Sequence, residues 1–137
     1  MGKPVVGLAK GSYVFTYLSQ HLYGGAAMPW TGTPNNTIRP QETTHDIWSQ
    51  PINTGISTND PVQVYADDGF HRMAGLLKEG SHPIEYLAQR DQDGSSHYPI
   101  AVQGKTGYWG FAEDSFSAYN DTLEDVFLNF LSYMLTK

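Results

Sequence analysis

The most regular hydrophobic pattern in the chain lies in its C-terminal segment, residues 121–135. Apolar side chains recur there every three or four positions, which is the spacing of one face of an α-helix. Leu128 and Leu135 widen this face, and Asn129 is one of the few polar residues left beside it. A helix that is apolar on most sides must be covered on most sides, either by its own chain or by a partner. The main apolar face consists of Leu123, Val126, Phe127, Phe130, Leu131 and Met134.

Both ends of this segment carry signals for a helix. Asp121 is a suitable N-cap residue, and Glu124, three positions later, can complete a capping box. Glu124 and Asp125 in the first turn, with Lys137 after the last turn, suit the helix dipole. The pattern therefore predicts a helix over residues 121–135, which is too short to span a bilayer because spanning takes about 20 apolar residues.

The middle of the chain has the alternating pattern of β-strands. Apolar residues occupy alternate positions in 62–66 and again in 98–102. Gly104–Gly107 then predicts a tight hairpin, after which Trp109 and Phe111 meet the apolar face of the preceding strand.

Other segments have weaker patterns. Residues 4–10 predict a short strand. Residues 13–23 predict a helix that a Gly-Gly pair ends, although residues 13–17 are also good strand formers. Residues 70–77 and 84–88 fit either a short helix or a strand.

Residues 24–61 are the most unusual part of the chain. They contain five prolines and four glycines among many Thr, Asn and Ser, with no helical period. We expect an extended arm or loop, longer than compact domains usually hold. Isolated large apolar residues along it argue against disorder, and we expect them to insert one at a time into a surface of the chain's own body or of a neighbour. These anchors are Met28, Trp30, Ile38, Ile47, Trp48, Ile52 and Ile56.

Together these patterns predict a single α+β domain over residues 1–137. We expect a small antiparallel sheet of four or five strands, covered on one face by the C-terminal helix, with residues 24–61 as an extended arm. Because the expected strands carry few large side chains, the helix would be the main cover of the sheet.

Composition and charge narrow the function classes. The chain has no cysteine, so disulfides and thiolate metal sites are excluded. Residues 1–41 contain three bases and no acid, whereas residues 42–137 contain all 14 acids and five bases, so +3 and −9 give the net charge of −6. This balance does not suit direct nucleic-acid binding. The basic part of one copy could lie on the acidic body of another copy or partner. Alternatively, the uneven distribution of charge arises by chance, because the chain has few charged residues. We also expect no signal peptide and no transmembrane segment.

No catalytic, nucleotide or metal motif is complete. Residues 104–106 resemble the end of a phosphate-binding loop, but Pro99 stands where that loop needs its first glycine. None of the five histidines forms an H-E-x-x-H pattern. We therefore expect no catalytic residue, no metal and no cofactor. A small metal-dependent hydrolase stays open as a third alternative, because His45 with Asp46, and His71 with the two aspartates just before it, could form a mixed nitrogen and oxygen site.

The aromatic residues offer a second alternative, a carbohydrate-binding module. Tyr108 and Trp109, beside Glu113 and Asp114, could stack on a sugar ring and bond its hydroxyls. The same aromatic residues suit a core or a protein interface equally well.

The leading hypothesis is a non-enzymatic assembly protein that binds copies of itself and a larger scaffold through the arm and the helix. By analogy of composition, small cysteine-free chains rich in Gly, Thr, Asn and aromatic residues, with extended arms, are typical of decoration, neck or tail components of phage particles. Its location would then be the virion. The predicted interface consists of the seven arm anchors with Phe127, Phe130, Leu131 and Met134.

Overall fold

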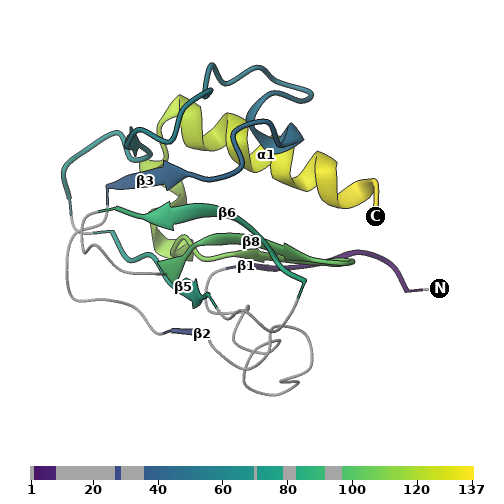
Figure 1. Cartoon of the computed structure of the whole chain (residues 1–137). Coiled ribbons are helices and arrows are strands. Elements are labelled where there is room, and N and C mark those ends of the chain that lie inside the picture. Colours follow the sequence, from purple (N-terminus) through teal and green to yellow (C-terminus); the bar gives the residue numbers. More distant parts are fainter. Residues whose placement is uncertain (1, 9–26, 29–35, 70, 79–82, 92–96) are drawn as a thin grey trace.

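The structure, a computed structural model, describes residues 2–8, 27–28, 36–69, 71–78, 83–91 and 97–137. Two β-sheets and one α-helix build the described part of the chain (Figure 1). The strands are β1 (Val5–Leu8), β2 (Ala27–Met28), β3 (Thr37–Pro40), β4 (Val62–Gln63), β5 (Gly75–Leu77), β6 (Glu85–Arg90), β7 (His97–Tyr98), β8 (Ile100–Gln103) and β9 (Thr106–Trp109). The helices are the 3-10 helices η3 (Asp46–Trp48) and η4 (Glu113–Ala118) and the α-helix α1 (Asp121–Leu135).

The larger sheet has six strands in the order β1-β9-β8-β6-β3-β4. Neighbouring strands run antiparallel except at one edge, where β1 runs parallel to β9. The predicted antiparallel sheet of four or five strands was therefore too small and lacked the parallel edge. A second sheet has the strand order β2-β5-β7. The parallel edge pairs Val5 with Thr106, and a pairing between residues so far apart in the chain leaves no local pattern in the sequence.

The predicted C-terminal helix is present over its full length as α1. Its N-cap is Asn120 rather than Asp121, because Asn120 has an extended backbone and its Oδ1 accepts the backbone N–H of Leu123 at 2.9 Å. Asp121 and Glu124 lie in the first turn, where negative charge favours the helix dipole.

The predicted hairpin is confirmed between β8 and β9. Gln103 pairs with Thr106 across a two-residue turn of Gly104 and Lys105. Gly104 has a φ of 55°, a left-handed conformation that glycine adopts without a steric penalty. As expected, Trp109 returns along the preceding strand and pairs with Ile100.

The other strand predictions are resolved as follows. β1 lies within residues 4–10, where a short strand was expected. Of the two segments that fitted either element, residues 70–77 include the strand β5, and residues 84–88 overlap the strand β6, which continues to Arg90. The helix predicted over 13–23 lies outside the described residues.

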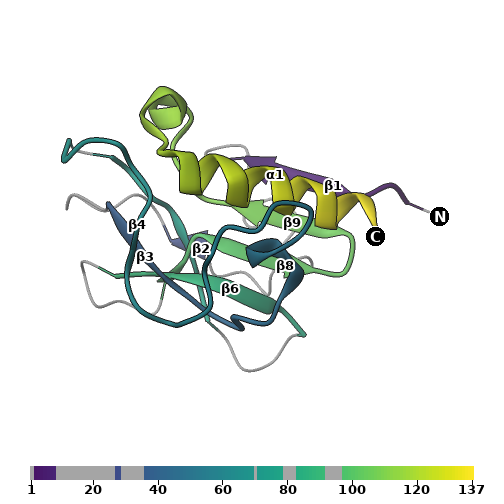
Figure 2. The same ribbon diagram turned by 90° about the horizontal axis from the view of Figure 1, so that it is seen from above.

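Layers of chain cover both faces of the larger sheet. On one face α1 lies over the β1 and β9 end, and the segment that contains η3 lies beside it over β8 and β6 (Figure 2). Ile100, Val102 and Trp109 belong to the core on this face, whereas Ala101 and Tyr108 belong to the core that faces the smaller sheet. Consecutive strand residues point to opposite faces, so the same strands serve two cores. The helix therefore covers one face, and the smaller sheet lies on the other.

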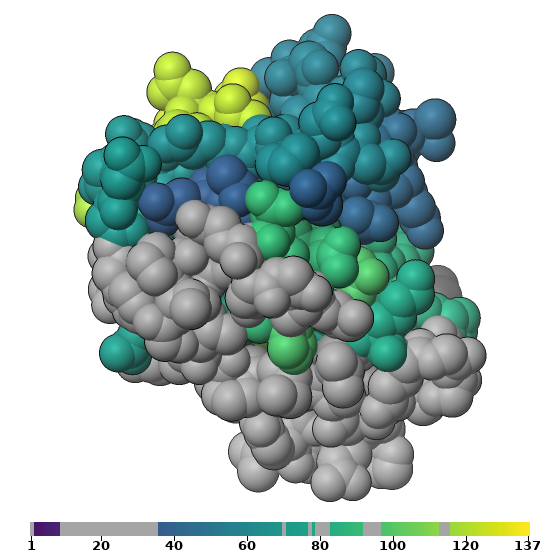
Figure 3. Space-filling view, turned by 60° about the vertical axis from the view of Figure 1, so that its left-hand side comes forward, coloured from purple at the N-terminus to yellow at the C-terminus, as the bar shows by residue number. Residues whose placement is uncertain are grey.

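The segment expected to be an extended arm supplies a strand inside the sheet. β3 lies between β6 and β4, with Ile38 opposite Arg90 on one side and Val62 on the other. The chain then passes through η3 and runs over the molecule next to α1, as the dark blue and teal surface of Figure 3 shows. Within residues 36–60 the arm thus packs on the chain's own body.

Gly107 sets the distance between β9 and α1. A Cβ atom added at this position would lie 2.7 Å from Phe130 Cζ and 3.0 Å from Met134 Sδ. We predict that Gly107→Ala lowers the free energy of unfolding by about 1–3 kcal/mol, because the side chains of Phe130 and Met134 must shift to make room for the added Cβ. Urea denaturation measures this change. Gly2→Ala is the control, since its Cβ would meet nothing within 4 Å; equal stability of the two variants would contradict the close packing of α1 on β9.

Candidate functional site

A buried asparagine joins α1 to the segment around η3. Asn129 has no solvent exposure, and its Oδ1 accepts the backbone N–H of Ile52 at 2.9 Å. Its Nδ2 donates to the carbonyl oxygens of Ile47 at 3.0 Å and of Ile52 at 2.7 Å. A buried amide has to be hydrogen-bonded, so these three bonds fix residues 47–52 on the helix in one register.

Trp48, in the same segment, forms hydrogen bonds with residues before and after η3. Its indole is fully buried, and Nε1 donates to the carbonyl oxygen of Gln41 at 3.0 Å. Its own carbonyl oxygen accepts from the hydroxyl of Thr54 at 2.5 Å and from the backbone N–H of Thr54 at 3.2 Å. Trp48 therefore ties the chain before η3, at Gln41, to the chain after η3, at Thr54.

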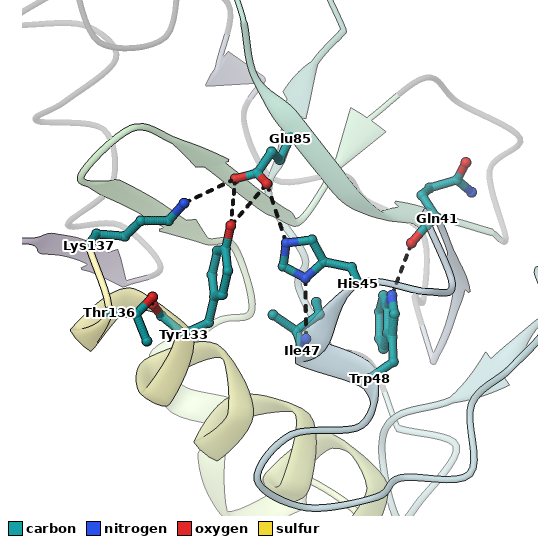
Figure 4. A network of polar contacts seen from close by, with 8 residues as sticks. All are labelled: Gln41, His45, Ile47, Trp48, Glu85, Tyr133, Thr136 and Lys137. Atoms are coloured by element: carbon teal, nitrogen blue, oxygen red, sulfur yellow. Dashed lines mark hydrogen bonds and ion pairs between the residues drawn. The ribbon is translucent and has the colours of Figure 1, made fainter.

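Glu85, at the start of β6, is the centre of a polar network at the C-terminal end of α1 (Figure 4). The Tyr133 hydroxyl donates to the two carboxylate oxygens at 3.0 and 3.2 Å, and Lys137 Nζ lies 3.9 Å from Oε2. His45 Nε2 lies 3.4 Å from Oε1. His45 Nδ1 accepts the backbone N–H of Ile47 at 3.2 Å, which leaves the proton of a neutral imidazole on Nε2, facing Glu85.

Burial and charge shift two pKa values in this network. Burial of the phenol raises the pKa of Tyr133 above its ordinary value of 10.0, and the Glu85 carboxylate adds to the rise while Lys137 opposes it. The contact with Tyr133 raises the pKa of Lys137 above 10.5, and Glu85 again adds to the rise. At neutral pH, Tyr133 is a neutral donor and Lys137 a cation, and both are directed at the same carboxylate. The network is suited to fixing the end of α1 on β6 and η3.

The residues of the carbohydrate alternative are not at the surface. Trp109 is fully buried, and the rings of Phe111 and Phe127 lie 4.7 and 4.8 Å from its ring. Its Nε1 donates to the Tyr119 hydroxyl at 3.0 Å. Tyr108 is fully buried in the other core. The expectation that these two residues stack on a sugar is therefore wrong, because strand alternation points each of them into a core.

The acids of the same alternative, Glu113 and Asp114, belong to η4. Their side chains lie outside the described part of the structure.

The predicted interface residues are largely used inside the chain. Ile38, Ile47, Trp48, Phe130 and Met134 are buried in the core under α1. Three more are partly buried against that core, namely Ile56, Phe127 and Leu131. Ile52 is half-buried beside Asn129. Met28 lies in β2 without a described side chain, and Trp30 lies outside the described residues.

The structure brings one predicted histidine–aspartate pair together. His71 Nε2 lies 2.5 Å from Asp67 Oδ1, and this hydrogen bond lowers the pKa of Asp67. The His71 ring also stacks on Tyr65 with a centroid distance of 4.0 Å. His45 points its ring to Glu85. Within the described ranges, no group of three or more His, Asp or Glu side chains is placed to hold a metal ion.

Large apolar side chains stay exposed along α1 and β1. Leu135 is 80% exposed and Leu128 is 52% exposed, while Val5 and Leu8 of β1 are 45% and 38% exposed. None of them was among the predicted interface residues. For Leu128 and Leu135, the sequence did contain a signal of exposure, because they widen the apolar face of the helix beyond what one sheet can cover. Leu8 and the partly buried Val6 point to the α1 face of the sheet, because they pair with Trp109 and Gly107, whereas Val5 alternates with them and points to the other face. We define Leu8, Leu128 and Leu135, with the partly buried Val6 and Leu131, as the β1–α1 surface.

Comparisons of the chain with protein-family models, with curated proteins and with solved structures found no match. In the part of the chain that the structure describes, no helix has the length and apolar character needed to cross a membrane.

Replacing the buried amide tests its role. We predict that Asn129→Asp, which keeps the size of the side chain, lowers the free energy of unfolding by about 2–4 kcal/mol, because a carboxylate cannot donate to the two carbonyl oxygens. Urea denaturation gives the value. Asn53→Asp is the matched control, since Asn53 is exposed and only accepts the N–H of Gly55. A loss of the same size in both variants would show that the buried bonds have no special weight.

Stability is expected to fall at alkaline pH. Burial raises the pKa of Tyr119 well above its ordinary value of 10.0, and the pKa values of Tyr133 and Lys137 are also raised. The folded chain therefore holds protons that the unfolded chain releases above about pH 10, so stability present below that pH is lost as the pH rises through the folded pKa values.

The variant Tyr119→Phe separates the contribution of this phenol. We expect it to be less stable at pH 7 by about 1–3 kcal/mol, because the Trp109 N–H loses its acceptor. Its stability should then decline less steeply above pH 10 in urea denaturation series. An unchanged slope would refute the assignment to Tyr119.

Proposed function

We propose that the chain is a non-enzymatic structural protein that binds copies of itself and a larger scaffold. The observation that carries this proposal is the β1–α1 surface, where Leu128 and Leu135 are more than half exposed on a helix that contacts β1, and Leu8 of β1 is exposed on the same face of the sheet. Contiguous apolar patches of this kind commonly mark protein interaction sites. The inner face of α1 is already packed, so these side chains are free for a partner.

The polar clusters support the same function. The Glu85 carboxylate accepts a hydrogen bond from the Tyr133 hydroxyl and lies within 4 Å of His45 Nε2 and Lys137 Nζ. This arrangement holds the C-terminal end of α1 in place. Asn129 ties the helix to residues 47–52. These groups act in positioning, and a well-fixed helix presents its outer face to a partner in one orientation.

Within this class, we propose a component of a virus particle, of the decoration, neck or tail type of a phage. The support is compositional: 14 glycines, 18 aromatic residues and no cysteine in 137 residues. The net charge of −6 also disfavours non-specific binding to packaged nucleic acid. No direct nucleic-acid contact is therefore proposed.

Velocity sedimentation of an extract from the source of the chain tests this function. We expect the native chain, detected by mass spectrometry, in fractions far heavier than its 15.2 kDa, and in purified viral particles at a fixed ratio to their other proteins. Sedimentation only as a free chain or a small oligomer would contradict binding to a scaffold. A fixed ratio in a non-viral particle would contradict the virion and leave the structural role in place.

A further inference from the structure

We propose that two copies of the chain pair antiparallel through β1, as a two-fold symmetric dimer with their α1 helices side by side. This inference rests on the proposed function and names one of its partners, a second copy.

Within the described residues, β1 is an open edge of the six-stranded sheet. Among the described strands, β9 is its only neighbour. The Val5 N–H donates to the Lys105 carbonyl oxygen at 2.8 Å, so the backbone groups of Val5 and Gly7 point to β9. The N–H and C=O groups of Val6 and Leu8 alternate with them and point away from the sheet. Such groups are a template for pairing with another strand.

The opposite edge of the sheet is occupied by the chain itself. Asn120 Nδ2 donates to the carbonyl oxygen of Gln63 in β4 at 2.8 Å, and the backbone N–H of Asn120 donates to the carbonyl oxygen of Val64 at 3.0 Å. Tyr65 forms a bridge with Tyr119 just beyond. Pairing of β1 with β4 of a next copy is therefore blocked. The β1 strand of one copy can still pair with the β1 strand of a second copy. Such a two-fold symmetric interface uses the same edge of both copies, so the assembly stops at a dimer.

The outer side of α1 extends this edge with apolar surface. Leu128, Leu131 and Leu135 follow one another at helical spacing on one side of the helix. Leu8 pairs with Trp109, which belongs to the core under α1, so Leu8 points to the same face of the sheet as the helix. Strand and helix contact each other and lie along the same side of the molecule (Figure 2).

The strand and the helix run in opposite directions. Gly107, which pairs with Val6, lies against Phe130 and Met134, whereas Trp109, at the Leu8 end of β1, packs on Phe127 earlier in the helix. The start of β1 therefore lies beside the end of α1.

Opposite charges lie at the two ends of this surface. Lys3 precedes β1, and Lys105 Nζ donates to the Gly2 carbonyl oxygen at 2.8 Å, so both lysines lie at the end where α1 finishes. Asp121 and Glu124 are exposed in the first turn of α1, at the other end. An antiparallel pair brings the basic end of each copy to the acidic end of the other, whereas a parallel pair would bring like charges together. The charge pattern thus selects a second copy in the antiparallel orientation.

The strand pairing also has a defined register. A two-fold axis at Gly7 places Val6 of each copy opposite Leu8 of the other, where both exchange N–H and C=O bonds. Pro4 is the next outward-facing position, and its missing N–H ends the ladder there. The two helices then meet through Leu128, Leu131 and Leu135 of both copies.

Light scattering and sedimentation equilibrium across a dilution series test the dimer. We expect a mass of twice 15.2 kDa that dissociates on dilution. Leu128→Gln with Leu135→Gln keeps good helix formers and should raise the dimer Kd at least about tenfold. Thr44→Gln with Ser57→Gln, at exposed positions outside this surface, is the control and should leave the Kd unchanged. A monomer at every concentration, or a dimer that the leucine variant leaves intact, would overturn the proposal.

Two further variants test the strand pairing and the orientation. Val6→Pro removes an outward-facing N–H without touching the Val5 bond to β9, and it should abolish the dimer while circular dichroism stays native. Lys3→Glu and Glu124→Lys should each weaken the dimer at low salt, and the double variant, which restores opposite charges across the axis, should recover it. A double variant as weak as the single ones would exclude the antiparallel arrangement.

The dimer through β1 and the binding to a larger scaffold can be refuted independently. A monomeric chain that still sediments with a heavy particle would overturn the dimer alone. A stable dimer that never enters a larger particle would support the β1 pairing and contradict the scaffold.

Discussion

The position of α1 on the sheet depends on the buried amide of Asn129. Hydrophobic packing has little directional preference, so Phe130 and its apolar neighbours alone would permit the helix to turn or slide. The three hydrogen bonds between the Asn129 amide and the backbone of Ile47 and Ile52 favour one register, since any other would leave the buried amide without partners. Gly107 leaves room for the side chains of Phe130 and Met134 against β9, and Glu85 holds the C-terminal end of the helix through Tyr133.

This constraint also decides which side of the helix faces solvent. With Asn129 turned to the η3 segment and Phe130 turned to the sheet, Leu128 and Leu135 have to point outward. The exposed leucines are thus a consequence of the same bonds that hold the core. Their position beside β1, which is an edge strand among the described residues, suits the assembly function proposed above.

Local pattern was sufficient for the helix at 121–135 and for the hairpin at Gly104, because each depends on residues close together in the chain. It was insufficient for the candidate site. Asn129 was visible only as a polar residue beside an apolar face, and nothing near Glu85 indicated that His45 and Tyr133 would meet there. Contacts between residues so far apart depend on the topology of the sheet, which no local period encodes.

The sequence by itself determined the elements with a strong period, the absence of cysteine chemistry and the excess of apolar surface on the last helix. Only the tertiary structure decided where those elements go. It placed β3 inside the sheet, set β1 parallel to β9 and turned Trp109 into the core. The physical reason is that a strand's two faces and two edges are equivalent until its neighbours are in place. Burial and hydrogen-bond pairing with distant segments then select one face for each side chain and one partner for each edge.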